Sequence, residues 1–357
     1  MRGDNVDQIT PKKSLWVAVF LPFPSEWSYS NTNTSKENFD QNYDLGEDSL
    51  MSIWNGIIRS YTDVNSDINL LEDYDFCLEA VHTPCNTASG IRSLFTQMKR
   101  RPETLAMIGP SCNHVTRALA QTARWWNLIQ MSFSVNDVAL SNRDLYPTFT
   151  RTIPSLRAQF IAVVSVLQHY NWSVVDVIHS NSPSGFENFN SFLEVVASTG
   201  ISIGTSTPYH PYNAGVLKGN GLDRLNETRN NVKIFLGASK DAFDMFCQIF
   251  LHYPNLKASR KVWILTGYVS DHWWKQSVQN CSSDDVRSAI QGHFLVDARS
   301  ANNMKNKTAT QDFSNERTTV TSSLTSYAYD AVLSVATALD ETIKVLCVIF
   351  IPEFITY

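Results

Sequence analysis

Residues 108–172 read IGPSCNHVTRALAQTARWWNLIQMSFSVNDVALSNRDLYPTFTRTIPSLRAQFIAVVSVLQHYNW, and this stretch decides the fold. Two short apolar runs, LAMIG at residues 105–109 and LIQMSF at residues 128–133, each lead through a polar turn into a helical pattern. A longer helical pattern, RAQFIAVVSVLQHY at residues 157–170, closes the stretch. Apolar strands that alternate with amphipathic helices are typical of a parallel sheet with helices on both faces.

The same alternation continues on both sides of this stretch. Upstream, strand and helix patterns occupy residues 14–22, 48–61, 75–81 and 90–100. Downstream of Pro154, they occupy residues 173–180, 186–199, 201–209, 232–238, 241–253 and 262–268. The chain has 357 residues, more than the roughly 250–300 that one hydrophobic core usually serves. We therefore predict two doubly wound units in tandem.

Bulk composition excludes several classes of protein. Hydrophobic residues make up 43% of the chain and charged residues 18%, which is ordinary for a globular protein. The net charge of −5 argues against a nucleic-acid partner, which needs a clustered basic surface. No apolar run reaches the roughly 18 residues that span a bilayer, and residues 1–13 lack the apolar core of a secretion signal. We expect residues 1–13 to be disordered.

Four short sequence segments carry a family resemblance. They are WNLIQMSF from residue 126, ALSNRDLYPTFTRTIPS from residue 139, HYNW from residue 169 and YAYDA from residue 327. Together they resemble the extracellular ligand-binding domain of metabotropic GABA receptors, the Venus flytrap module of class C G-protein-coupled receptors. The resemblance implies an α/β, bilobed, type I periplasmic-binding-protein-like fold. In that fold, two doubly wound parallel sheets are joined by a hinge, and a small amino-acid-like ligand binds between the lobes.

The resemblance also divides the chain. Residues 14–152 are expected to form the first part of lobe one, residues 153–298 lobe two, and residues 299–344 a return crossing with a further lobe-one helix. Residues 345–357 resemble no part of the family, so we interpret them as an atypical tail of a truncated chain. Full-length members lie on the extracellular face of the plasma membrane. They contact a G protein only through a membrane region that this sequence lacks.

The turns that follow two strands are candidates for ligand contacts. In open α/β sheets, ligands bind beyond the carboxyl ends of the strands, where backbone N–H groups at helix starts favour anions. The turns after LAMIG and LIQMSF therefore make Asn113, Ser134 and Asn136 candidate donors to a ligand carboxylate. An alternative for the first turn is that Ser111 and Asn113 simply cap a helix.

Further ligand contacts follow from the resemblance alone. It implies that Trp27 and Tyr268 cover the ligand when the lobes close, although ordinary aromatic packing is an alternative for both. Lobe two is expected to add contacts from its own strand ends, at Ser182, Ser184, Ala238 and Ser239.

Several positions depart from the GABA-binding members of the family. Asn113 replaces a serine, and residues 134–137 replace a glycine and a serine run. Ile153 replaces a histidine, and Ala238 aligns with the tyrosine that closes from lobe two. The glutamate that pairs with the ligand amine aligns with Leu324 or a serine beside it. Because a desolvated zwitterion needs both of its charges matched, the departures argue against GABA itself. We interpret the chain as a receptor-type domain that has lost or changed its ligand.

The cysteines fit the same family. The chain has six cysteines, and the resemblance implies the disulfides Cys85–Cys112 and Cys247–Cys281. Disulfides need an oxidising compartment. Cys77 lies in a strand pattern, so we interpret it as a buried free thiol.

The resemblance implies a protein partner, a second receptor subunit in a homodimer or heterodimer. Lobe one carries this contact in the family, through the helices that match residues 90–100 and 115–126. Within the first helix, the stripe Ile91, Leu94, Phe95 and Met98 is interpreted as core. Trp125 and Trp126 would point about 100° apart on a helix, so at least one should be exposed.

Other functional classes find little support. The sequence has no nucleophile elbow, P-loop, zinc-protease motif or dinucleotide fingerprint, and its eight histidines are not spaced as a metal set. We expect no catalytic residue, no metal and no cofactor, hence no enzyme. Two alternatives share the fold: the ligand-binding domain of a receptor guanylate cyclase, and a soluble small-molecule binding protein.

Five N-x-[ST] glycosylation sequences occur, a number that chance alone would give. They begin at Asn33, Asn171, Asn226, Asn280 and Asn306.

Overall fold

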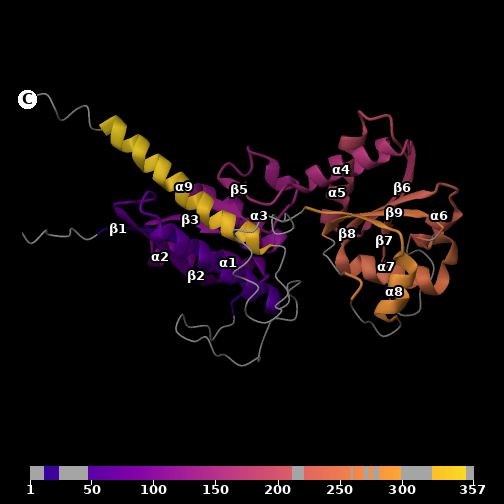
Figure 1. The fold of residues 1–357 in the computed structure, drawn as a ribbon, viewed down its shortest axis with the longest axis horizontal. Helices are drawn as coiled ribbons and strands as arrows, with labels where there is room; N and C mark the ends of the chain where they lie inside the picture. The colour runs from indigo at the N-terminus through magenta and orange to yellow at the C-terminus, as the bar shows by residue number, and fades with distance from the viewer. Residues whose placement is uncertain are drawn as a thin grey trace, which may run out of the picture. The chain divides into compact units, whose positions relative to one another are not determined.

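The chain forms two compact units in the computed structural model, which describes residues 12–23, 47–210, 221–258, 260–268, 273–275, 281–298 and 324–350 (Figure 1). Unit 1 comprises Met1–Asn136, Leu140–Ile153 and Arg299–Tyr357. Unit 2 comprises Asp137–Ala139 and Pro154–Ala298.

Unit 1 is built on a parallel sheet of five strands in the order β2-β1-β3-β4-β5. The strands are β1 (Lys13–Leu21), β2 (Tyr74–His82), β3 (Thr104–Ile108), β4 (Ile129–Ser132) and β5 (Phe149–Arg151). The helices are α1 (Glu47–Ser66), α2 (Thr87–Arg100), α3 (Asn113–Ala123) and α9 (Thr325–Phe350), with the 3-10 turns η1 (Arg124–Trp126) and η2 (Ala139–Ser141).

Alternation along β1 explains why unit 1 has a helical layer on each side. Val17, Val19 and Leu21 pack into the cluster that contains residues of α1 and α9. Ala18 and Phe20 point the other way, into the cluster formed with α2 and α3. Successive side chains of a strand face opposite sides of its sheet, so a strand apolar at every position must be covered twice.

Unit 2 repeats the plan with five parallel strands in the order β10-β9-β8-β6-β7. The strands are β6 (Val174–Ser180), β7 (Ser202–Tyr209), β8 (Val232–Ala238), β9 (Val262–Tyr268) and β10 (Phe294–Val296). The helices are α4 (Leu156–His169), α5 (Pro183–Val196), α6 (Leu222–Glu227), α7 (Ser239–His252) and α8 (Ser283–Ile290), with the 3-10 turn η3 (Pro254–Leu256). Ile234 and Leu236 of β8 pack toward α4 and α5, whereas Phe235 packs toward α6, α7 and α8. The predicted α/β class, with two doubly wound parallel sheets, is confirmed.

The two units share one topology. Numbered along the chain within each unit, both sheets have the strand order 2-1-3-4-5. In such a sheet, the chain leaves its first strand toward one edge and later continues toward the other, so a crevice opens between the first and third strands at their carboxyl ends. The topological switch point therefore lies at the carboxyl ends of β1 and β3 in unit 1, and of β6 and β8 in unit 2.

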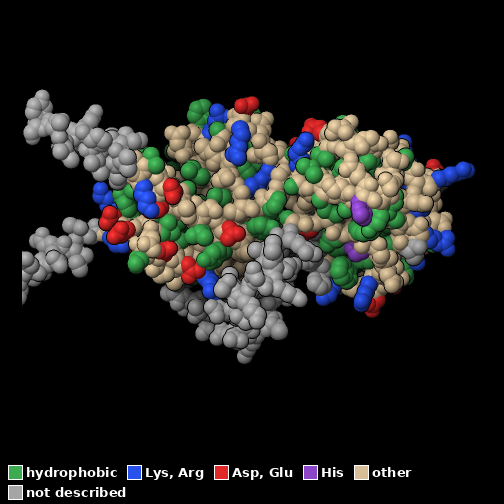
Figure 2. All heavy atoms as spheres, turned by 45° about the horizontal axis from the view of Figure 1, so that its top comes forward, with side chains coloured by type: hydrophobic (Ala, Val, Ile, Leu, Met, Phe, Trp, Pro, Cys, Tyr) green, Lys and Arg blue, Asp and Glu red, His purple; other side chains and the backbone are tan. Residues whose placement is uncertain are grey.

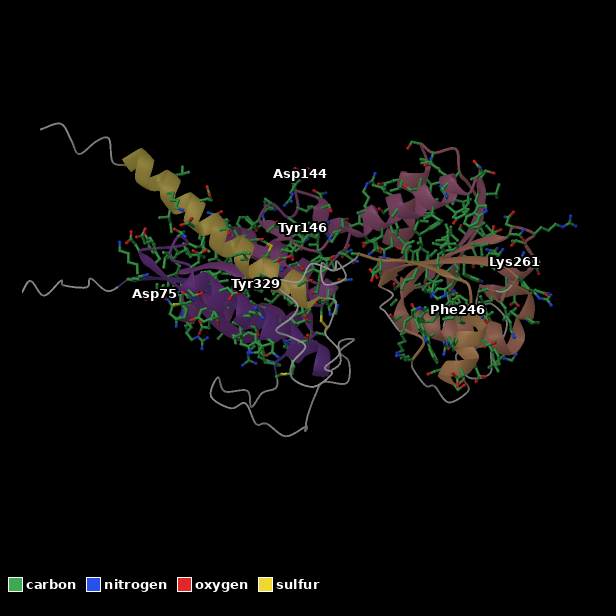
Figure 3. The ribbon with its side chains drawn as sticks, viewed as in Figure 1. Asp75, Asp144, Tyr146, Phe246, Lys261 and Tyr329 are labelled. Atoms are coloured by element: carbon green, nitrogen blue, oxygen red, sulfur yellow. A yellow bond between two sulfur atoms is a disulfide. The ribbon has the colours of Figure 1, made fainter. Side chains whose placement is uncertain are left out.

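The last helix belongs to the first unit. Tyr329, labelled in Figure 3 where α9 runs beside α1, donates its hydroxyl hydrogen bond to Asp63 at 2.8 Å. Ser52 of α1 and Thr325 of α9 are hydrogen-bonded at 2.7 Å. The helix continues beyond residue 344, the expected end of this lobe-one segment, since neither proline nor glycine interrupts the chain before Pro352. No helix in the described residues is long and apolar enough to span a bilayer.

Two local expectations about unit 1 were wrong. The helix expected over residues 115–126 ends at Ala123, and η1 follows it, because Asn127 adopts a left-handed conformation at φ 51°. Cys77 is a free thiol but is only half-buried, since it lies on β2 at the edge of the sheet.

Candidate functional site

The turn between β3 and α3 is held rigidly at the carboxyl edge of unit 1. Gly109 has φ +91°, and a Cβ there would lie 2.5 Å from the Phe20 carbonyl oxygen, so only glycine fits. The Gly109 N–H donates to Met131 at 2.8 Å, and Gln130 donates to the Gly109 carbonyl at 3.0 Å. Cys112 is disulfide-bonded to Cys85, with their Cα atoms 5.7 Å apart. This disulfide has the pairing that the resemblance implies.

Asn113 is the first residue of α3, and its side chain does not cap that helix. The N-cap position is Cys112, which makes no side-chain capping hydrogen bond. Asn113 therefore does not occupy the N-cap position, and the alternative as it concerns Ser111 stays untested. A helix start without a side-chain cap leaves N–H groups available, and the helix dipole favours an anion there.

The neighbouring turn after β4 contains two buried polar atoms without partners. The Oγ of Ser134 and the Oδ1 of Asn136 are shielded from solvent and have no hydrogen-bond partner among the described residues. Ser132 is satisfied, since its Oγ accepts the Val135 N–H at 3.2 Å. An unpaired buried polar group costs about 1–3 kcal/mol, and a ligand that supplies the partner would remove that cost. Six other residues of the described chain also have such an atom: Ser60, Gln130, Thr148, Ser191, Gln248 and Trp273.

The orphaned atom of Asn136 has a chemical consequence. Oδ1 accepts hydrogen bonds, whereas the sequence pattern suggested that Asn136 donates to a carboxylate. A half-turn of the amide exchanges its oxygen and nitrogen, so the same position can serve a donor or an acceptor on the ligand. Because β3 pairs directly with β4, the turn that carries Asn113 and the turn that carries Ser134 and Asn136 leave adjacent strands.

Two predicted aromatic contacts have little or no structural description. Trp27 lies outside the described residues. Tyr268 is the last residue of β9 and pairs in the sheet with Ala238, but its side chain lies outside the described part. Their proposed role over a ligand stays a prediction.

At the carboxyl edge of unit 2, the polar residues bond to one another. Ser180, at the end of β6, donates a short hydrogen bond to Asp241 in the first turn of α7. Ser182 caps α5 by accepting the Gly185 N–H at 3.0 Å, and its hydroxyl lies 3.1 Å from that of Ser184. The sequence did not single out Ser180, which ends β6, or Asp241, which lies in the first turn of α7 after β8, although both adjoin the topological switch point of unit 2.

A buried histidine adjoins this edge. His179 is 2% exposed and contacts the rings of Phe186, edge-to-face at 4.8 Å between centroids, and Phe189, stacked at 4.9 Å. Burial lowers the pKa of His179 from its ordinary value, against the opposing effect of its hydrogen bond to the Ser180 carbonyl. The imidazole is therefore held neutral and acts as part of the apolar packing under α5.

Three positions that the resemblance aligns with polar ligand partners are apolar here. Ile153 is 7% exposed, and Leu324 packs against the core that α1 and α9 share with the sheet. Ala238 occupies the N-cap position of α7 and makes no side-chain hydrogen bond there. None of these three side chains can pair with a ligand charge.

Two cavities lie away from these turns. One of about 270 Å³ in unit 1 is lined by residues that include Lys12, Asp67 and Glu72, and one of about 670 Å³ in unit 2 by residues that include Trp274 and Arg287. In the described parts of the chain, no group of His, Cys, Asp and Glu could hold a metal ion.

An aromatic surface lies on α2 and η1 of unit 1. Leu94 and Met98 are buried, but Phe95 is 52% exposed, so its expected place in the core was wrong. Phe95 instead packs edge-to-face with Trp126, with centroids 5.1 Å apart. Trp125 is 81% exposed, which confirms that the tryptophan pair is not wholly buried. We call Phe95, Trp125 and Trp126 the aromatic surface.

Charges of both signs are mixed on the face that Figure 2 shows. In the view of Figure 2, basic and acidic side chains are interspersed among apolar ones. This distribution agrees with the net charge of −5 and gives nucleic acid no basic surface on that face.

Comparisons with known proteins point to receptors. Residues 57–348 match the family described as receptor family ligand binding region. The gamma-aminobutyric acid type B receptor subunit 2 of Homo sapiens is 27% identical over 297 residues, 78% of this chain and 30% of that protein. Subunit 1 of Mus musculus is 26% identical over 297 residues, with the same coverage of 78% and 30%. Taste receptor type 1 member 3 of Rattus norvegicus is 29% identical over 178 residues, 48% of this chain and 20% of that protein. The chain thus spans about 30% of the length of the type B subunits that it matches.

Proposed function

Because the chain belongs to the family of receptor ligand-binding regions, we propose that it is the ligand-binding domain of a receptor of the GABA type B kind. The observation that carries the proposal is the pair of buried, unpartnered atoms on Ser134 and Asn136, next to the uncapped start of α3 at Asn113. Polar atoms left without partners at the carboxyl edge of a parallel sheet are what a ligand site in this fold needs.

The proposed ligand is a small, amino-acid-like molecule other than GABA. The start of α3 favours a carboxylate, and the two orphaned atoms supply directional hydrogen bonds. Leu324, Ile153 and Ala238 offer no charge to the amine of GABA. Pairing of that amine would need a carboxylate, since a desolvated ammonium without a partner is costly. Asp137 does not change this, because it lies on the turn proposed to hold the anion.

A titration tests the ligand proposal. We expect GABA to bind no more tightly than about 1 mM, while an amino-acid-like ligand that does bind loses roughly 5–100-fold in affinity on Ser134→Ala or Asn136→Ala, the equivalent of one buried hydrogen bond. In the free protein, Ser134→Ala should leave stability unchanged or raise it, because it removes an atom that has no partner. Ser165→Ala, on the exposed side of α4, is the matched control. If calorimetry shows that GABA binds in the micromolar range, and that Ser134→Ala abolishes this binding, then GABA is a ligand and the proposal is wrong on this point.

We place the domain outside the cell. Its two disulfides, Cys85–Cys112 and Cys247–Cys281, are stable in oxidising compartments and rare in the cytosol. The type B relatives are named as receptor subunits, and none of the three relatives above is named as an enzyme.

The proposed protein partner is a second receptor subunit that contacts the aromatic surface. Two curated relatives are named as numbered subunits, which implies assembly for those proteins. Aromatic side chains are enriched at protein interfaces, and tryptophan is over-represented among the residues that dominate the binding energy. The surface also stands clear of the turns proposed to bind ligand, since Phe95 and Trp125 lie on α2 and η1.

Substitution of one tryptophan tests the partner proposal. Trp125→Ser is expected to weaken association with a second copy of the chain or with a type B subunit ectodomain by about tenfold or more. Ile68→Ser is the control, because Ile68 is 82% exposed on the same unit but lies after α1, outside the aromatic surface. Sedimentation equilibrium measures both. Equal association constants for Trp125→Ser and Ile68→Ser would exclude this surface.

A further inference from the structure

Asn171 terminates α4 in a defined geometry. The helix ends at His169, Tyr170 is its C-cap, and Asn171 has φ +55°. The Asn171 N–H donates to Gln168 at 3.1 Å, and the Trp172 N–H donates to Leu167 at 2.8 Å. These two bonds define a Schellman motif, in which the residue after the C-cap is left-handed. Its usual apolar contact is present, because Trp172 and Leu167 belong to one cluster.

The fold needs only the backbone of Asn171. Glycine is the commonest residue at this left-handed position, and asparagine is the side chain that tolerates it best. Asn171 is exposed, and within the described residues no hydrogen bond engages its side-chain amide. The amide nitrogen is therefore free to react without any loss to the helix cap.

The amide belongs to a glycosylation sequence whose hydroxyl is also unused. Asn171-Trp172-Ser173 is an N-x-S sequence, and the exposed Ser173 uses only its backbone carbonyl, which accepts from Ser202 at 2.8 Å. The other such sequence in the described residues differs. Its Thr228 hydroxyl donates to Asp176 at 2.6 Å, inside a buried polar network.

The residues on either side of Asn171 in the sequence are aromatic, and their rings stack on each other. Tyr170 is 49% exposed and stacks on Trp172, with centroids 4.7 Å apart and planes at 20°. Phe294 approaches the two rings at 6.2 and 6.3 Å. The apolar C–H face of a sugar packs well on exposed aromatic faces, and such exposed apolar groups are usually covered by a partner. This group lies at the amino ends of β6 and β10, the opposite end of the strands from Ser180 and Ala238.

We propose that Asn171 is an N-glycosylation site and that the first sugar of its glycan covers the Tyr170–Trp172 stack. The donor is a lipid-linked pyrophosphoryl oligosaccharide. A bond forms between Asn171 Nδ2 and the anomeric carbon, the bond from that carbon to the pyrophosphate oxygen breaks, and the lipid pyrophosphate leaves while the amide proton passes to the transferase. No oxidant or reductant is needed. The site requires that the chain enter a secretory compartment, and it does not depend on which ligand the domain binds.

Glycopeptide mapping tests the site. The full chain is secreted from insect or mammalian cells behind a cleavable signal sequence, and an amidase then converts each glycosylated asparagine to aspartate in ¹⁸O-labelled water. We expect the label at Asn171, loss of one glycan in Ser173→Ala and Asn171→Gly, and retention in Ser173→Thr. Asn171→Gly keeps the left-handed cap, so a folding defect cannot imitate loss of the glycan. An unlabelled Asn171 peptide from secreted chain overturns the proposal, whatever the occupancy of the other sequences.

Partial deglycosylation tests the packing of the first sugar. An endoglycosidase that leaves one sugar should preserve the melting temperature, and the amidase should lower it by about 2–4 °C. Tyr170→Ala should abolish that difference, although both proteins acquire the same aspartate at the amidase step. If Tyr170→Ala shows the full difference, the sugar does not rest on the rings and that part of the proposal fails. Loss of ligand binding in the domain would leave both readouts unchanged.

Discussion

Substitution of Lys233 by alanine is expected to destabilise unit 2 by roughly 3–5 kcal/mol, the cost of leaving a buried charge without its partner. The side chains of Lys233 and Asp176 are both fully buried and form an ion pair between β8 and β6. The Asp176 carboxylate also accepts hydrogen bonds from Asn230 at 2.7 Å and from the Thr205 N–H at 2.9 Å. Alanine would remove the cation and leave the carboxylate in the interior.

Hydrogen exchange of unit 2 peptides measures this loss. Lys261→Ala is the control, because Lys261 lies at the amino end of β9 (Figure 3) and donates only to Asn230 and Asn231 near the surface. We expect less than about 1 kcal/mol from the control. The double substitution Asp176→Leu with Lys233→Met should recover most of the stability, since well-packed apolar pairs often replace buried ion pairs at little cost. Equal effects of Lys233→Ala and Lys261→Ala would contradict the assignment.

Low pH should remove the contribution of the Asp176–Lys233 ion pair to the stability of unit 2. Burial opposes ionisation of Asp176, but hydrogen bonds from Lys233, Thr228 and Asn230 outweigh it and lower the pKa of the carboxyl. A carboxyl whose pKa is lower in the folded state contributes stability above its unfolded pKa of about 3.9, and loses it as the pH falls through the folded value. Unit 2 should therefore weaken below pH ~4, and the Asp176→Leu, Lys233→Met protein should weaken less.

Removal of the Cys247–Cys281 disulfide has the second large effect. The bridge joins α7 to the start of α8 across 34 residues of sequence, and both cysteines are at most 5% exposed. Chain-entropy arithmetic for a loop of that length gives about 3.5–4 kcal/mol at 25 °C. We expect Cys247→Ala with Cys281→Ala to lower the free energy of unfolding of unit 2 by about this amount, as measured by denaturant titration.

A third cysteine supplies the control for that experiment. Cys77 is a half-buried free thiol on the edge strand β2 of unit 1, so Cys77→Ala should change stability by less than about 1 kcal/mol. Addition of a reductant should reproduce the double substitution in the wild type and have no further effect on unit 2 of the double variant. If reduction leaves hydrogen exchange in α7 and α8 unchanged, the bridge does not stabilise this layer.

The sequence predicted the architecture because each buried strand is a run of apolar residues. Strands with one solvent-exposed face carry polar residues at alternate positions, and residues 14–22 (SLWVAVFLP) and 262–268 (VWILTGY) do not. These segments therefore predict helices on both sides of each sheet. The buried ion pair could not be predicted in the same way. Asp176 and Lys233 each interrupt an apolar strand, which signals that each needs a partner, but only the register of β6 against β8 shows that they are neighbours.

The candidate site was predicted only in outline. Its location follows from topology, since Asn113 and Ser134 come just after strands that end at the same edge of the sheet. Which atoms lack partners depends on burial, which residue types alone do not give. The same limit explains Phe95, whose spacing in α2 matches that of Leu94 and Met98 although its ring lies outside the core.

The placement of α9 in unit 1 has a consequence for synthesis. Asp63 of α1 and Tyr329 of α9 are 266 residues apart, whereas unit 2 is nearly all one continuous segment, Pro154–Ala298. As the ribosome extends the chain, unit 2 can therefore complete its core before α9 has been synthesised. Ile53 and Ile57 of α1 share their core cluster with residues of α9, so the core of unit 1 is incomplete at that stage. A nascent chain that ends at Ala298 should resist protease in unit 2 and be cut in unit 1. Equal resistance of the two units would show that unit 1 folds without α9. The unit that leaves the ribosome first is thus expected to be the last to fold.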